Sequence, residues 1–142
     1  MENTFDLERF VQAQADLYKD VVSELTAGAK RTHWMWFIFP QVEALGHSEF
    51  SRRFGIRSRD EATAYLGHPI LGPRLRHCVE LMLQHENKTA RQILGSPDDL
   101  KFQSCVTLFV SVDTAPSRFQ EALKKYFDGS KDVRTLEILS GK

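Results

Sequence analysis

The segment SPDDLKFQSCVTLFVSV, residues 96–112, decides the fold class of this chain. Ser96 and Pro97 followed by two aspartates are typical of a helix N-terminus, where carboxylates interact favourably with the helix dipole. The residues beyond them are apolar over more than half of a helical wheel at about 100° per residue. These residues are Phe102, Cys105, Val106, Leu108, Phe109, Val110 and Val112. A helix that is apolar on most sides is buried, so we expect residues 97–112 to form the central helix.

Amphipathic patterns predict further helices on both sides of this segment. Helices are expected over residues 6–28, with room for one break, over 58–66, over 73–86 after a turn at Leu71 and Gly72, and over 119–127 after a cap at Asp113 or Thr114, with a short last helix capped by Asp132. Only residues 33–39 form an apolar run short enough to be a strand. The sequence therefore predicts an all-α fold, a single compact orthogonal domain over residues 1–142 with seven to nine helices around the central one.

Composition bounds the class of protein. The chain has 142 residues, 42% of them hydrophobic and 27% charged, which is typical of one globular domain and excludes a disordered or collagen-like chain. Its 19 basic and 19 acidic side chains cancel, so no global field attracts nucleic acid or an anionic membrane, and we expect neither as a partner.

Location and redox state follow from two further observations. No stretch approaches the roughly 18 apolar residues of a membrane span, and residues 1–10 are charged without an apolar core, so we expect no anchor, no secretory signal and a cytoplasmic protein. Cys78 and Cys105 lie within apolar helical patterns and are predicted to be buried, reduced thiols.

Four stretches resemble, in order and spacing, a bacterial family catalogued as domain of unknown function 1810. They are KRTHWMWFIFPQ (residues 30–41), EATAYLGHPILGPRL (61–75), DDLKFQSCVTLF (98–109) and YFDGSKDVRTLEIL (126–139). The nine residues HWMWFIFPQ, 33–41, are the most specific, because two tryptophans, a histidine and a proline rarely occur so close together. The resemblance implies a mainly α-helical single domain and carries no established activity.

Common catalytic and metal-binding motifs are missing from the sequence. It contains no glycine-rich phosphate loop, no HExxH and no CxxC. His77 and His85 would lie eight residues apart on one helix, too far for one metal ion without other ligands, so we expect no metal site. The sequence leaves open which cofactor, if any, the protein uses and whether it is an enzyme.

Polar residues within apolar helical faces are the first functional signal. Burying a polar side chain costs about 1–3 kcal/mol unless it finds a partner. Gln14 falls in the apolar stripe of the first helix, so we expect it to be buried and hydrogen-bonded to another segment. Arg74 and Lys101 lie at or within core-facing arcs, and we expect both to approach residues 33–39. A structural network between helices and a ligand pocket both remain open.

Aromatic and basic clusters are the second signal. Residues 33–39 contain His33, Trp34 and Trp36 close behind Lys30 and Arg31. Most of this segment should be core, but one indole at the rim would form a platform for a flat ring, with cations for a phosphate. A second cluster is the only dense basic stretch: Arg52, Arg53, Arg57 and Arg59 around Phe54. Such residues can contact phosphates, although zero net charge favours a solvated helix end.

Two functions follow from these patterns. The first is a binding protein or enzyme for an anionic small molecule, for example a nucleotide-like ligand, with a pocket formed by His33, Trp34, Trp36, Arg74, Lys101 and Gln14. The second is a non-catalytic interaction or structural module whose polar residues are satisfied internally. Convergence of the named side chains on a cleft would distinguish them, and the oligomeric state stays open.

Overall fold

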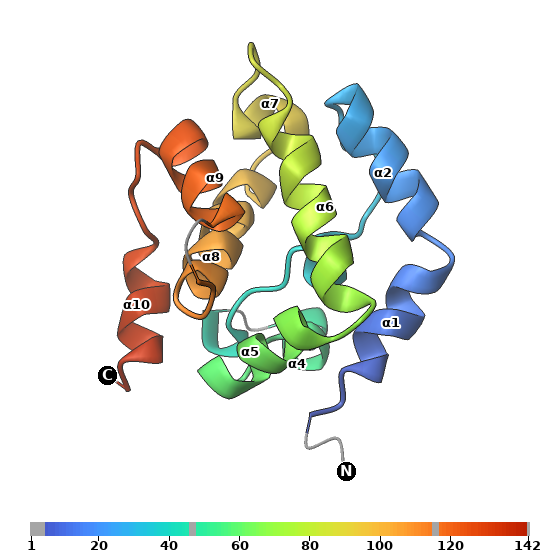
Figure 1. Ribbon diagram of the computed structural model, residues 1–142. Helices are drawn as coiled ribbons and strands as arrows, with labels where there is room; N and C mark the ends of the chain where they lie inside the picture. Colours follow the sequence, from blue (N-terminus) through green and yellow to red (C-terminus); the bar gives the residue numbers. More distant parts are fainter. Residues whose placement is uncertain (1–4, 46–47, 115–116, 142) are drawn as a thin grey trace.

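Helices alone build the part of the chain that the computed structural model describes, residues 5–45, 48–114 and 117–141 (Figure 1). In chain order they are α1 (Glu8–Ala15), α2 (Tyr18–Ala27), α3 (Met35–Ile38), the 3-10 helix η1 (Glu43–Leu45), α4 (Glu49–Phe54), α5 (Arg59–Gly67), α6 (Leu71–Leu83), α7 (Ala90–Leu94), α8 (Asp98–Val110), α9 (Arg118–Phe127) and α10 (Val133–Leu139). These residues contain no strand, only an isolated parallel bridge between Val42 and Ile56. The predicted all-α fold is confirmed, with ten α-helices in the described residues rather than seven to nine. None of the described helices is long and apolar enough to cross a membrane.

Helix α8 is the predicted central helix. It contacts α3, α5, α7, α9 and α10, and seven of its residues are buried: Phe102, Ser104, Cys105, Val106, Thr107, Leu108 and Phe109. The helix begins at Asp98 after Pro97, so Ser96 does not act as its cap. Helix α8 is buried on nearly every side, which confirms the prediction from its apolar residues that it is the central helix.

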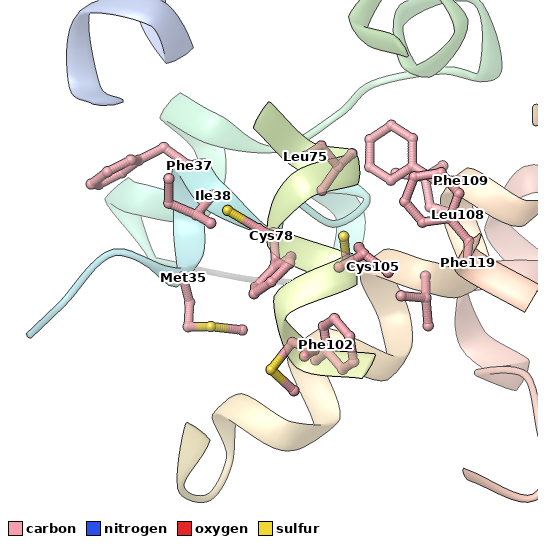
Figure 2. Packing of buried hydrophobic residues seen from close by; sticks show 14 of the residues in the cluster. Met35, Phe37, Ile38, Leu75, Cys78, Phe102, Cys105, Leu108, Phe109 and Phe119 are labelled. Carbon is pink, nitrogen blue, oxygen red and sulfur yellow. The ribbon is translucent and has the colours of Figure 1, made fainter. Parts of the chain in front are cut away.

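The core is formed where α3, α6, α8 and α9 meet (Figure 2). Figure 2 shows Leu75 of α6 on the side of Phe109 and Leu108 of α8, and Cys78 on the side of Ile38 of α3. Phe102 lies at the centre of an aromatic group: its ring is 4.8 Å from that of Phe39 in an edge-to-face arrangement, and it also contacts the rings of Tyr126 and Phe127. Edge-to-face packing is favoured for aromatic pairs. The contacts of Phe102 with Tyr126 and Phe127 fix α8 against α9.

The first long helix is broken once, between α1 and α2. Its C-cap is Gly28 as expected, in a left-handed conformation with φ of 73°, whereas its N-cap is Leu7 rather than Asp6. The break lets the ring of Tyr18 lie under the guanidinium of Arg74, 4.6 Å from centroid to Cζ, and lets α2 pack against α6.

Besides the caps at Asp6 and Ser96, three further local predictions are wrong. Residues 33–39 contain the short helix α3 and no strand. Helix α6 begins at Leu71, so Leu71 and Gly72 belong to the helix instead of a turn. A Cβ at position 72 would lie 2.1 Å from the carbonyl oxygen of Leu66, so glycine is needed where the end of α5 meets the start of α6.

The third error concerns the start of α9, which is capped by Ser117 and not by residues 113–114. The carboxylate of Asp113 accepts two hydrogen bonds from the guanidinium of Arg76 on α6, at 3.1 and 3.3 Å. Because that pairing occupies the carboxylate, it is not available to cap a helix. The expected cap at Asp132 is present, since its side chain accepts from the backbone N–H of Thr135.

Candidate functional site

Trp34 is buried in the core, with 1% of its surface exposed. Its indole N–H donates to the Glu24 carboxylate over 3.0 Å, and the same carboxylate accepts from the backbone N–H groups of Arg31 and Thr32 and from the Thr32 hydroxyl. Burial alone would raise the pKa of Glu24, but these hydrogen bonds outweigh it and lower the pKa to about 2. Glu24 therefore holds the segment that leads into α3.

This hydrogen-bonded carboxylate predicts a pH-dependent stability. The pKa of Glu24 is lowered from 4.5 to about 2 in the folded protein, so its contribution is complete above about pH 5 and is lost as the pH falls towards 2. Glu24→Gln should therefore lower the free energy of unfolding near neutral pH, with a smaller difference from wild type at about pH 3. Urea unfolding at both pH values measures this difference in the free energy of unfolding between Glu24→Gln and wild type.

Glu86→Gln is the matched control, because Glu86 is exposed on the loop after α6. It should leave the pH dependence of the wild type unchanged. A gap between Glu24→Gln and wild type that is equally large at both pH values would contradict the role assigned to Glu24.

Trp36 is the tryptophan that reaches the surface. Its half-buried ring lies 3.9 Å from the Lys101 ammonium and nearly parallel to Phe50, with ring centroids 6.3 Å apart and 14° between the planes. Lys101 also lies 3.6 Å from the Asp98 carboxylate, which pairs with Lys30 at 3.0 Å. The expected approach of Lys101 to residues 33–39 is thus present, and Asp98 partly neutralises it.

Gln14 is buried, as predicted, with 1% of its surface exposed. Its amide nitrogen donates to the Phe37 carbonyl over 2.6 Å and to the Tyr65 hydroxyl over 3.2 Å, and its amide oxygen accepts from Arg74 over 3.3 Å. Arg74 has no ion pair with a described residue, and its guanidinium lies above the ring of Tyr18. Arg74 therefore reaches residues 33–39 only through Gln14.

Both cysteines are free and buried, as the apolar patterns predicted. Burial raises the pKa of the Cys78 thiol to about 12, although its hydrogen bond with Tyr18 and the nearby Arg74 act in the opposite direction. Burial also raises the pKa of Cys105 well above its ordinary value. Neither thiol is placed to act as a nucleophile.

Of the six predicted ligand-binding residues, His33 is exposed, Lys101 contacts Trp36, and Arg74 contacts Gln14. None of the six is among the residues that line three clefts on the described surface. Over residues 5–45, 48–114 and 117–141, no group of three or more His, Cys, Asp or Glu side chains is placed to hold a metal ion.

A cleft between α1 and α4 is lined by four arginines. Its volume is about 490 Å³, and we call it the arginine cleft. It is lined by Asp6, Glu8, Arg9, Gln12, Arg52, Arg53 and Arg57. The basic stretch noted in the sequence thus meets a further arginine from α1.

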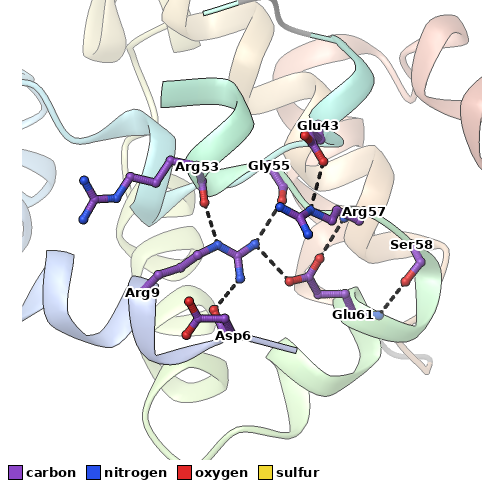
Figure 3. Close-up of polar contacts among 8 residues, drawn as sticks. All are labelled: Asp6, Arg9, Glu43, Arg53, Gly55, Arg57, Ser58 and Glu61. Carbon is purple, nitrogen blue, oxygen red and sulfur yellow. Dashed lines mark hydrogen bonds and ion pairs between the residues drawn. The ribbon is translucent and has the colours of Figure 1, made fainter. Parts of the chain in front are cut away.

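Arg9 is the fixed member of this cleft (Figure 3). Its guanidinium donates to the Glu61 carboxylate over 2.9 Å and to the carbonyls of Asp6, Arg53 and Gly55. The side chain of Glu61 is only 2% exposed. Since every branch of the guanidinium has an acceptor, Arg9 ties α1 to the chain around α4 and α5.

Glu61 also orders the segment that carries Arg57. One oxygen of its carboxylate binds Arg9, and the other accepts from the backbone N–H of Arg57 over 2.8 Å. The Ser58 hydroxyl accepts from the backbone N–H of Glu61, as the spacing predicted. The capping box is not reciprocal, because the Glu61 side chain points to Arg9 and Arg57 instead of the Ser58 N–H.

The other arginines of the cleft are free to meet a ligand. Arg52 and Arg53 are exposed and form no ion pair with a described residue. Arg57 pairs with Glu43 at 3.1 Å, but its side chain is 69% exposed. An exposed pair of this kind contributes at most about 1 kcal/mol, so a stronger anion can replace Glu43.

The sequence did not identify Arg9 and Glu61 as site residues. Glu61 was recognised only as the third residue of a capped helix, a position where an exposed carboxylate is common. Arg9 and Glu61 are 52 residues apart, and such a pairing has no local pattern that could indicate it.

The fold and this cleft define a small all-helical protein with a cationic surface cleft. The chain belongs to the family described as "Protein of unknown function (DUF1810)", which matches residues 4–139. A crystal structure of a conserved hypothetical protein from Mycobacterium tuberculosis is similar to it, with 49% sequence identity and a TM-score of 0.95, over 97% of this chain and 99% of that chain. No curated protein matches the chain. The family resemblance found in the sequence is therefore confirmed.

Proposed function

We propose that this protein binds an anionic small molecule in the arginine cleft. One observation carries the proposal: four arginines line a cleft of about 490 Å³, and two of them, Arg52 and Arg53, have no ion pair with a described residue. Pockets of roughly 300–1,000 Å³ are the usual size for small-molecule sites. The ligand class agrees with the one expected from the sequence, at a different place on the surface.

The chemistry of arginine supports a phosphate or carboxylate group as the recognised part. A guanidinium offers donors in a planar fork that matches both groups in a bidentate manner. Glu61 neutralises Arg9, so the cations available to a ligand are Arg52, Arg53 and Arg57, and the carboxylates of Asp6 and Glu8 in the same lining oppose part of their field. Because Arg9 is already bonded on all sides, it shapes the wall of the cleft.

The aromatic surface predicted from the sequence lies beside this cleft. Phe50 and Arg53 are three residues apart on α4, and residues at this spacing are neighbours on a helix. Phe50 stacks on Trp36, which Lys101 covers. His33, Trp36, Arg74 and Lys101 stay predictions as ligand-binding residues.

The experiment is a calorimetric titration with tripolyphosphate, an anion without any ring. The wild type should bind it, and the double variant Arg52→Gln/Arg53→Gln should bind at least about tenfold more weakly for each arginine removed, because a hydrogen bond to a charged group contributes about 1.5–3 kcal/mol. Binding should also weaken as salt increases.

A control double variant with the same change in net charge distinguishes binding in the arginine cleft from a general effect of charge on binding. Arg91→Gln/Arg134→Gln removes two exposed arginines from α7 and α10, which do not line the cleft. It should bind tripolyphosphate as the wild type does. Equal weakening in the two double variants, or no binding to the wild type, would overturn the proposal.

The alternative function is a non-catalytic interaction module. Phe50, Leu100 and Val133 expose 56%, 57% and 63% of their surface. They belong to three different helices, and single exposed apolar residues are normal on soluble proteins. These observations support ligand binding more than docking of a partner.

A further inference from the structure

A second cleft lies on the other side of Arg57. It has a volume of about 330 Å³, and Arg57 lines both this cleft and the arginine cleft. Figure 3 shows Arg57 on the Ser58 side of the Arg9 guanidinium, with Arg53 on the opposite side. The two clefts therefore adjoin at Arg57.

The walls of the second cleft differ in chemistry from those of the first. Val42, Ile138 and Leu139 form an apolar wall contributed by the chain before η1 and by α10. Asp60, in the first turn of α5, brings a carboxylate to the same cleft, and Arg59 brings a second guanidinium beside that of Arg57. An apolar wall suits a flat ring, and a carboxylate accepts hydrogen bonds from amino or hydroxyl groups.

We infer that the ligand is bipartite: its phosphate groups bind in the arginine cleft, and its uncharged ring, which carries hydrogen-bond donors, binds in the second cleft. Nucleoside phosphates are the chemical class that combines these two parts. Arg57 lies at the junction, where its guanidinium faces the phosphates and its backbone N–H is held by Glu61. This inference rests on the proposed function.

The stacked pair of Trp36 and Phe50 is the other surface that can accept a ring. Neither residue lines the arginine cleft or the second cleft, whereas Arg57 belongs to both clefts. Phe50 and Trp36 already stack on each other, and Lys101 lies over the Trp36 ring. The ring is therefore assigned to the cleft of Val42 and Leu139.

The test on the wild type compares tripolyphosphate with the four common ribonucleoside triphosphates by calorimetric titration. At least one nucleotide should bind about tenfold or more tightly than tripolyphosphate, which corresponds to about 1.4 kcal/mol from the ring. Equal affinities would overturn the bipartite ligand and leave the proposed anion binding intact. Failure of tripolyphosphate and all four nucleotides to bind would overturn the proposed function and this inference with it.

Variants on α10 locate the ring. Leu139→Ser should remove the preference for the nucleotide without weakening tripolyphosphate, whereas Leu136→Ser, on the same helix but outside both clefts, should keep the preference. Phe50→Ser should also keep it. Loss of the preference in Phe50→Ser, with Leu139→Ser unchanged, would move the ring to the aromatic pair and overturn the inference.

A measurement on the wild type covers the case in which Leu139→Ser does not fold. In methyl NMR spectra, the nucleotide should shift the signals of Ile138, and tripolyphosphate should leave them unchanged. Identical shifts with the two ligands, or no shift of Ile138 with the nucleotide, would overturn the assignment of the second cleft.

Discussion

Replacing Glu61 with alanine is expected to lower the free energy of unfolding by roughly 3–5 kcal/mol, because removing one partner of a buried ion pair leaves the other charge uncompensated. Glu61 is 2% exposed and Arg9 11% exposed, and their charged groups are 2.9 Å apart. The variant also leaves the backbone N–H of Arg57 without its acceptor. Urea unfolding followed by circular dichroism measures the change.

Glu43→Ala is the matched control for this effect. Glu43 also pairs with an arginine near the cleft, but the two side chains are 30% and 69% exposed, so its loss should cost less than about 1 kcal/mol. Equal costs for the two variants would contradict the structural role of Glu61. The double replacement of Arg9 and Glu61 by methionine should be milder than Glu61→Ala, since it leaves no unpaired charge.

Phe102→Ala is the second substitution with a large expected effect, a loss of roughly 3–5 kcal/mol in the free energy of unfolding. Phe102 is fully buried and its ring contacts those of Phe39, Tyr126 and Phe127. Truncation removes buried apolar surface and leaves a cavity between α8 and α9. The midpoint of urea unfolding should therefore fall sharply.

Phe50→Ala tests whether this cost comes from burial. Phe50 has the same side chain but is 56% exposed, so its truncation should change the free energy of unfolding by less than about 1 kcal/mol. If both variants lost the same stability, α8 would not be the centre of the core.

The fold could be predicted where a residue's environment follows from local spacing. The apolar wheel of residues 96–112 identified α8 as central, and the apolar stripe of the first helix placed Gln14 inward. Both predictions depend on a period of 3.6 residues, which a sequence displays directly. The cap of α9 at Ser117 was missed because the carboxylate of Asp113 pairs with Arg76, 37 residues away. The start of α6 at Leu71 was missed because it depends on the close contact of Gly72 with the Leu66 carbonyl at the end of α5.

The candidate site was harder to predict because its geometry depends on long-range pairing. The sequence showed the basic stretch that includes Arg52, Arg53 and Arg57, but it gave no sign that Arg9 would join it. Conversely, Lys101 does contact Trp36 and Arg74 does contact Gln14, yet Gln14 is buried whereas Trp36 reaches the surface. Spacing predicts which side of a helix a residue occupies, but not which helix lies opposite.

The two buried thiols allow local opening of the protein to be measured by thiol modification. Cys78 is on α6 and Cys105 on α8, and with pKa values raised by burial neither forms a reactive thiolate in the closed protein. Modification by a thiol reagent must then wait for each helix to separate from the core, so the two rates report two opening free energies. Equal rates would mean that α6 and α8 open as one cooperative unit, and a faster Cys78 would mean that α6, with α2 packed against it, opens while α8 stays closed.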